Sequence, residues 1–167
     1  MEPMTLSHAD RLFVLFQDPE LYQFIPRDPP ASLEKFLENI KFLEGRLSRD
    51  GSENWLNWIC VDKASNEITG KIEMSIHKEN RSGYLAYYTF QKFWGKGYAK
   101  EACRQVIEHV FNEWNTDKIV IEIDTRNTAS VRLVESLRAS KVGFKAKADF
   151  FKGRNSDEYL YELRRPQ

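Results

Sequence analysis

The segment Lys92-Phe93-Trp94-Gly95-Lys96-Gly97-Tyr98-Ala99 joins a strand-like run at 84–90 to an amphipathic helix that continues to about Trp114. Two glycines separated by one residue let the backbone turn tightly and approach a ligand closely. The first N–H groups of a helix have no partner within it, and the helix dipole places partial positive charge there. A phosphate or pyrophosphate therefore fits this end of the helix.

Length and composition narrow the class of protein. The 167 residues are enough for one domain, residues 1–167, that buries its own core. The 25 basic and 25 acidic side chains cancel, so a general attraction to nucleic acid or anionic membranes is not indicated. Cys60 and Cys103 lie in apolar runs without metal-ligand spacing, which is typical of buried, reduced thiols. We expect a cytoplasmic protein without a metal site, membrane span or signal peptide.

Hydrophobic periodicity predicts four helices and six strands. The helices are expected at 7–16, at 33–47, from the glycines to about 114, and at 128–140. The strands are expected at 55–61, 68–76, 84–90, 118–124, 143–151 and 158–163, the last two forming a hairpin around 152–156. Consecutive strands with helices interposed indicate an α+β fold built on a mixed sheet.

Three ordered motifs make the sequence similar to a known family. Residues 93–102 resemble an R/Q-x-x-G-x-G/A coenzyme A loop, 127–130 (Asn-Thr-Ala-Ser) an N-x-x-S element after a strand, and Gly143-Phe144 the G-F that begins the next strand. The chain thereby resembles the GNAT superfamily of acyl-CoA-dependent N-acetyltransferases, and within it the RimJ and RimL ribosomal-protein N-terminal acetyltransferases. The resemblance covers nearly the whole chain. It implies a mixed, mostly antiparallel sheet of six to seven strands flanked by about four helices.

The sequence departs from the family pattern at several positions. Lys92 stands at the R/Q position, but the loop works mainly through backbone N–H groups, so we expect pyrophosphate binding to survive. Tyr84 stands about where an acidic strand residue is often found. Only residues 1–6 precede the first helix, so the first strand of the family is either vestigial or the gene start is misassigned.

The resemblance implies acetyl-CoA as the cofactor and assigns its contacts. The amides of 95–99 would bind the pyrophosphate, backbone near Tyr88 and Phe90 would pair with pantetheine as an extra strand, and Asn127 would contact it from the opposite side. The implied cofactor-binding residues are Tyr88, Phe90, Lys92, Gly95, Lys96, Gly97, Tyr98, Ala99, Lys100, Asn127 and Ser130. Several have simpler interpretations, because Lys96 and Lys100 could be solvated helix charges and Asn127 a cap.

The implied reaction needs a base and an acid. A primary amine is protonated near neutral pH, so a base must remove a proton before the amine attacks the thioester, and an acid can help the thiolate leave. The resemblance places the acid at Ser130 and the base at Asp149, with Glu73 in reserve. Ser130 could equally be a helix cap, Asp149 a charge that discourages edge pairing, and Glu73 a solvated side chain.

Two functions remain open from the sequence. One is an N-acetyltransferase that moves an acetyl group to a primary amine, either a small molecule or a peptide N-terminus, by direct attack on the thioester. The other is a non-catalytic module that binds acyl-CoA on the same fold, suggested by the missing strand carboxylate. The charge balance argues against a strongly cationic acceptor. Dimers are common in the superfamily, so a homodimer is one expectation.

Overall fold

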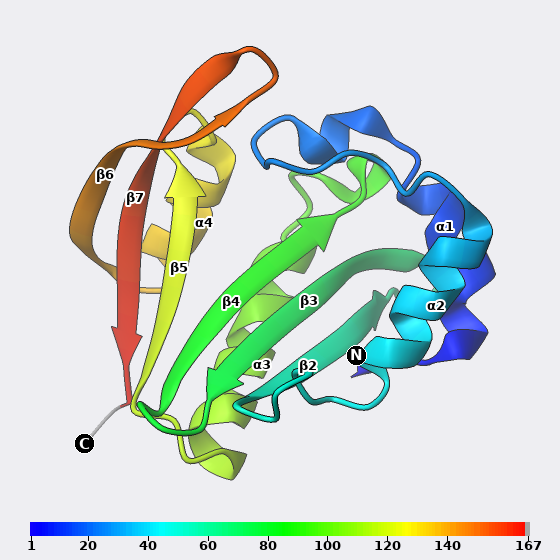
Figure 1. Cartoon of the computed structure of the whole chain (residues 1–167), viewed down its shortest axis with the longest axis horizontal. Coiled ribbons are helices and arrows are strands. Elements are labelled where there is room, and N and C mark those ends of the chain that lie inside the picture. The colour runs from blue at the N-terminus through cyan, green and yellow to red at the C-terminus, as the bar shows by residue number, and fades with distance from the viewer. Residues whose placement is uncertain (166–167) are drawn as a thin grey trace.

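The computed structural model describes residues 1–165, which form one seven-stranded sheet with helices on both faces (Figure 1). The strands are β1 (Glu2–Pro3), β2 (Glu53–Val61), β3 (Ile68–His77), β4 (Ser82–Thr89), β5 (Lys118–Asp124), β6 (Ser140–Phe151) and β7 (Arg154–Arg164). The α-helices are α1 (Ala9–Leu15), α2 (Leu33–Leu43), α3 (Tyr98–Glu113) and α4 (Thr128–Ser136). Short 3-10 turns lie at Leu6–His8, Pro19–Tyr22 and Gln91–Phe93. The expected α+β architecture is confirmed.

The sheet opens in its middle. Its strand order is β1-β2-β3-β4-β5-β7-β6, and all neighbours are antiparallel except β4 and β5. These two pair only where Ser82, Gly83 and Tyr84 meet Lys118–Val120. Beyond that point β4 stays with β3 and β5 stays with β7, so the strands diverge (Figure 1). Each therefore has a free backbone edge that faces the other.

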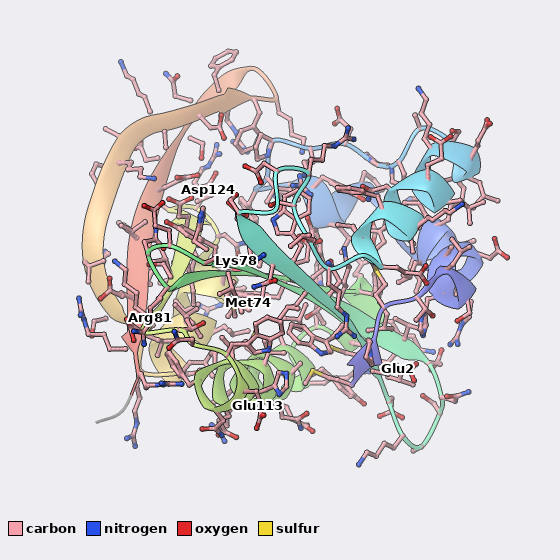
Figure 2. The ribbon with its side chains drawn as sticks, turned by 60° about the horizontal axis from the view of Figure 1, so that its bottom comes forward. Glu2, Met74, Lys78, Arg81, Glu113 and Asp124 are labelled. Carbon is pink, nitrogen blue, oxygen red and sulfur yellow. The ribbon has the colours of Figure 1, made fainter. Side chains whose placement is uncertain are left out.

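Two cores hold the sheet from opposite faces. Ile72 and Met74 of β3 belong to one core with Val106 of α3, and Figure 2 shows Met74 on the side of the sheet that α3 covers. On the other face, Ile59 of β2 packs with Leu12 of α1 and Ile40 of α2. Ile59 and Cys60, neighbours on β2, enter different cores, as the two-residue period of a strand requires.

Two predicted helices end earlier than expected. The helix predicted for 33–47 stops at Leu43, and the one predicted for 128–140 stops at Ser136. Soon after each end an arginine adopts a left-handed conformation, Arg46 with φ 52° and Arg138 with φ 66°. Such a residue reverses the chain after a helix. Gly143 consequently lies inside β6 rather than at its start.

The two outer parts of the sheet, the β6–β7 hairpin and β1, also differ in detail from the prediction. A two-residue turn, Lys152-Gly153 with φ 49° and 75°, joins β6 to β7 in place of the longer 152–156 segment. Positive φ at both positions matches the twist of a tight hairpin. The first strand exists as β1, two residues that pair with Trp58 and Ile59. No helix in this described range is long and apolar enough to cross a membrane.

Candidate active site

A cavity of about 650 Å³ occupies the opening between β4 and β5. One wall is residues 85–89 of β4 with the glycine turn, and the other is residues 121–124 of β5 with the start of α4. Residues 20–25 close one side. We call this cavity the interstrand cleft. The cleft lies here because β4 and β5 pair only over a short stretch, and beyond it their unpaired edges face each other.

The glycine turn presents open backbone to the cleft. Gly95 and Gly97 have φ values of 71° and 87°, which favour glycine strongly. A Cβ added at either position would meet no atom within 4 Å, so both face empty space. Gly97 is the N-cap of α3, and no side chain caps this end. The free N–H groups and the space in front of them fit the diphosphate of coenzyme A.

The lysines of the segment take different positions. Lys92 Nζ lies 2.5 Å from Glu67 Oε1, so its charge is already paired. Lys96 lies over the Phe93 ring, 5.7 Å from the centroid, and only Lys100 of the three lines the cleft.

Tyr98 fixes the start of α3 on the neighbouring turn. Its hydroxyl donates a hydrogen bond of 2.6 Å to Asp62 Oδ2. That bond, with others from Ser65, lowers the pKa of Asp62 to about 2. The side chain of Tyr98 therefore orients the helix, while its backbone amide faces the cleft side.

The free edge of β4 is not at the residues that were expected. The Phe90 amide donates to the Thr69 carbonyl of the β3 side at 3.0 Å, and Phe90 is only 4 % exposed. Because backbone groups alternate along a strand, those of Tyr88 also point to β3, and those of Tyr87 and Thr89 face the cleft. The Thr89 carbonyl accepts a hydrogen bond from the Trp94 indole at 2.6 Å. The pairing of β4 with β3 decides which β4 residues turn their backbone groups to the cleft, and the sequence does not reveal this pairing.

Ser130 and Asn127 lie together on the opposite wall. Asn127 is the N-cap of α4, and its Oδ1 accepts the Ser130 amide at 3.1 Å. The capping interpretation of Asn127 therefore holds, and the cap uses the Ser130 backbone rather than its hydroxyl. Ser130 lines the cleft.

The sequence suggested a core position for Tyr87 and no role in the site, yet its hydroxyl lies near Ser130. This hydroxyl is buried and has no hydrogen-bond partner among residues 1–165. Burial raises the pKa of Tyr87, and the proximity of Ser130 partly offsets the rise. A buried phenol without a partner is a donor available to a ligand.

Asp124, also missed by the sequence analysis, anchors this wall. It ends β5, where its carboxylate pairs with the Arg126 guanidinium and accepts the Ser156 hydroxyl at 2.7 Å. These bonds overcome the effect of burial and lower the pKa of Asp124. The β5 end, the turn to α4 and β7 are thus joined by one ionised side chain.

A second cavity of about 370 Å³ lies on the face of the sheet near α1 and α2. It is lined by charged and apolar side chains, and we call it the charged pocket. Its lining is Phe16, Tyr22, Arg27, Asp28, Pro30, Phe36, Asn39, Leu43, Trp55, Leu56, Asn57, Lys71, Glu73, Met74, Ser75 and Tyr88. Tyr88 lines both cavities, so the pocket and the cleft meet at this side chain.

Glu73 lies in the charged pocket rather than in bulk solvent. The Lys71 side chain is only 9 % exposed, and its Nζ lies 2.6 Å from Glu73 Oε1. Burial opposes ionisation of Glu73, but Lys71 and then Arg27 outweigh it and hold the pKa of Glu73 below its usual range. Burial, and next the Glu73 charge, raise the pKa of Tyr88 to about 12. Glu73 is therefore an ionised carboxylate beside a neutral phenol.

Asp149 is not among the residues that line the cleft, whereas Ser130 is. Asp149 lies on β6, an edge strand of the sheet, opposite Ser156 of β7, and it lines neither cavity. A register shift between Lys145 and Asp149 displaces this part of β6. The hairpin tip just beyond it does reach the site, because Lys152 Nζ donates to the carbonyls of Tyr22 and Ile25.

Comparisons with known proteins agree with this geometry. The family model described as Acetyltransferase (GNAT) domain matches residues 1–140. The chain is 29 % identical over 164 residues to an uncharacterised N-acetyltransferase, p20, of Bacillus licheniformis, covering 98 % of this chain and 90 % of the relative. A ribosomal-protein-S5-alanine acetyltransferase from Vibrio fischeri superposes with a TM-score of 0.87 at 20 % identity, covering 99 % and 92 % of the two chains.

A spermidine N-acetyltransferase from Vibrio cholerae, solved with CoA and spermine, superposes with a TM-score of 0.84 at 18 % identity, covering 98 % and 94 %. At these identities the two solved structures show a shared fold. The family match covers most of the chain and includes the glycine turn and both walls of the cleft. The protein therefore belongs to the GNAT family of acetyltransferases.

Proposed function

We propose that this protein transfers the acetyl group of acetyl-CoA to a primary amine by direct attack of the amine on the thioester. The observation that supports it most is the meeting of two cavities at Tyr88. One has free helix amides and an open glycine turn, and the other has an ionised carboxylate, Glu73. An acyl carrier and an amine could therefore enter from different sides.

The interstrand cleft contains groups suited to each part of the carrier. Amides from Gly95 to Ala99 would hold the diphosphate, with Lys100 as the nearby cation. The free edge at Tyr87 and Thr89 would pair with the amides of pantetheine, in place of the Tyr88 and Phe90 edge first expected. Bound there, the carrier supplies an activated acyl group.

Glu73 suits the role of base better than Asp149 does. The acceptor must lose a proton to become nucleophilic, and Glu73 is ionised at neutral pH and lines the pocket next to Tyr88. One of its oxygens binds Lys71, which leaves the other for the amine or for a water between them. Asp149 lies outside both cavities.

Ser130 is placed to complete the transfer on the other wall. As the N–C bond forms and the C–S bond breaks, the amine proton passes to Glu73, directly or through water. The Ser130 hydroxyl gives its proton to the departing sulfur and regains one from water. The unpartnered Tyr87 hydroxyl beside it supplies a hydrogen bond to the same region.

The test is thiol release from acetyl-CoA in the presence of a panel of primary amines, with acetyl-CoA binding followed separately by calorimetry. We expect binding and amine-dependent release. Binding without release on any amine would favour a non-catalytic acyl-CoA module. Absence of binding would remove the role of the cleft altogether.

A further inference from the structure

The charged pocket is close to electrically neutral before any acceptor enters. Arg27 and Lys71 contribute two positive charges, and Asp28 and Glu73 contribute two negative charges. Lys71 and Glu73 also contact each other at 2.6 Å. A pocket of this kind offers little net attraction to a polycation, whose charges would require an excess of carboxylates.

Arg27 provides a cation that the protein itself does not pair. It lies between the 3-10 turn Pro19–Tyr22 and α2, and it forms no ion pair within the part of the chain that the structure describes. Burial and Lys71 affect the pKa of Glu73 more strongly, and burial dominates for Tyr88 and Tyr22, but the charge of Arg27 lowers the pKa of each of these three groups. Arg27 is exposed and lines the pocket, where its guanidinium suits a carboxylate or a similar anion.

Asn39, Asn57 and Ser75 also line the pocket, but several aromatic and aliphatic side chains complete the wall, and the pocket is small. Aromatic and aliphatic side chains from α2, from β2 and from the residue after α1 form part of its wall, namely Phe16, Phe36, Leu43 and Trp55. Its volume of about 370 Å³ lies near the lower end of the roughly 300–1,000 Å³ that small-molecule sites span. Such a pocket fits a compact ligand with an apolar body.

We propose that the acceptor is a small primary amine that carries an anionic group beside the amine and an apolar body, as an apolar or aromatic α-amino acid does. The assignment rests on the proposed function, because it takes the charged pocket as the place where the amine meets the acyl group. The amine faces Glu73, the anionic group faces Arg27, and the body packs against Trp55 and Phe36. This arrangement gives Arg27 and Glu73 each a partner on the ligand, while Lys71 stays with Glu73.

Matched amines test the proposal directly. L-phenylalanine and L-methionine would each be compared with the amine that lacks only the carboxylate, 2-phenylethylamine and 3-(methylthio)propylamine, and with spermidine. Thiol release gives kcat/KM, and calorimetry on the protein saturated with coenzyme A gives the affinity of each amine. We expect each amino acid to exceed its decarboxylated partner at least about tenfold in both measurements, the size of one charge-assisted contact.

The Arg27→Gln variant identifies the source of this preference. It should lose about tenfold in affinity for L-phenylalanine and change little towards 2-phenylethylamine. Arg164→Gln is the control, because its side chain is 78 % exposed and it lies at the end of β7 that pairs with Lys118, away from the cleft. Equal use of the matched amines, or a preference that survives in Arg27→Gln, would overturn the proposal.

Calorimetric binding of the amines and thiol release test this proposal and the proposed enzymatic function separately. Arg27-dependent binding of L-phenylalanine without thiol release from any amine would support the acidic ligand and contradict catalysis. Release with 2-phenylethylamine or spermidine, together with no binding of either amino acid, would support catalysis and contradict the acidic acceptor.

Discussion

The interstrand cleft and the charged pocket meet at Tyr88 but are built in opposite ways. The wall of the cleft that we propose to bind phosphate comes from consecutive residues, 95–100, and would act through backbone N–H groups. The pocket draws on residues from 16 to 88, which lie after α1, in a 3-10 turn, in a loop, on α2 and on three strands. A site made of consecutive backbone groups tolerates changes of side chain, whereas a site made of scattered side chains can change its ligand with single substitutions.

The largest effect is expected for Gly97→Trp, which would fill the space in front of the α3 amides. Affinity for acetyl-CoA by calorimetry should fall below detection. Because a non-glycine residue at φ 87° is strained by about 1–2 kcal/mol, the matched control is Gly51→Trp, which has φ 74° and equally open surroundings in a distant turn. Unchanged affinity in Gly97→Trp would refute the proposed diphosphate site.

Glu73→Gln should be the most damaging change in the charged pocket. It keeps an oxygen for Lys71 but removes the base, so kcat should fall by about 10²- to 10⁴-fold, while Asp149→Asn should change it less than about twofold. A reversal of these two results would restore Asp149 as the base. Thermal denaturation of both variants checks that the fold persists.

The pH profile sharpens the same comparison. Because the pKa of Glu73 is lowered, this carboxylate is ionised at neutral pH, and its protonation cannot limit the rate there. The rate should therefore rise between pH 6 and 9 with the fraction of deprotonated acceptor amine. An inflection in kcat near pH 6 that moves in Glu73→Gln would contradict the assigned protonation state.

Ser130→Ala should have an intermediate effect, lowering kcat about tenfold with a smaller change in KM. Stability should be nearly unchanged, because the Asn127 cap accepts the Ser130 amide, which alanine retains. Full turnover in this variant would show that the position serves α4 alone.

The smallest effect is expected for Lys92→Gln. Glu67 already binds this ammonium, and the pair is exposed, where ion pairs contribute about 0–1 kcal/mol. Affinity for acetyl-CoA should change less than about twofold. A tenfold loss would mean that Lys92 leaves Glu67 to reach the phosphates.

Local signals in the sequence were sufficient for most of the fold. Periodicity located all four α-helices and six of the seven strands, and the glycine turn was placed at the start of α3. The helix end at Ser136 was missed because Arg138 takes a left-handed conformation without glycine. The end at Leu43 was missed although Gly45 stands two residues after it, next to the left-handed Arg46. The free edge of β4 was misassigned because alternation gives two choices, and only the Phe90–Thr69 bond selects one.

By itself, the sequence determined the family, the order of elements and the place of the glycine turn at the start of α3, since each depends on residues close together in the chain. Only the tertiary structure decided that Glu73 and Arg27 share a pocket, that Asp149 lies outside it, and that Tyr87 faces Ser130. The physical reason is that these relations depend on strand register and on where the sheet splays. Both are set by long-range pairing, in which a shift of one residue would turn every side chain to the other face.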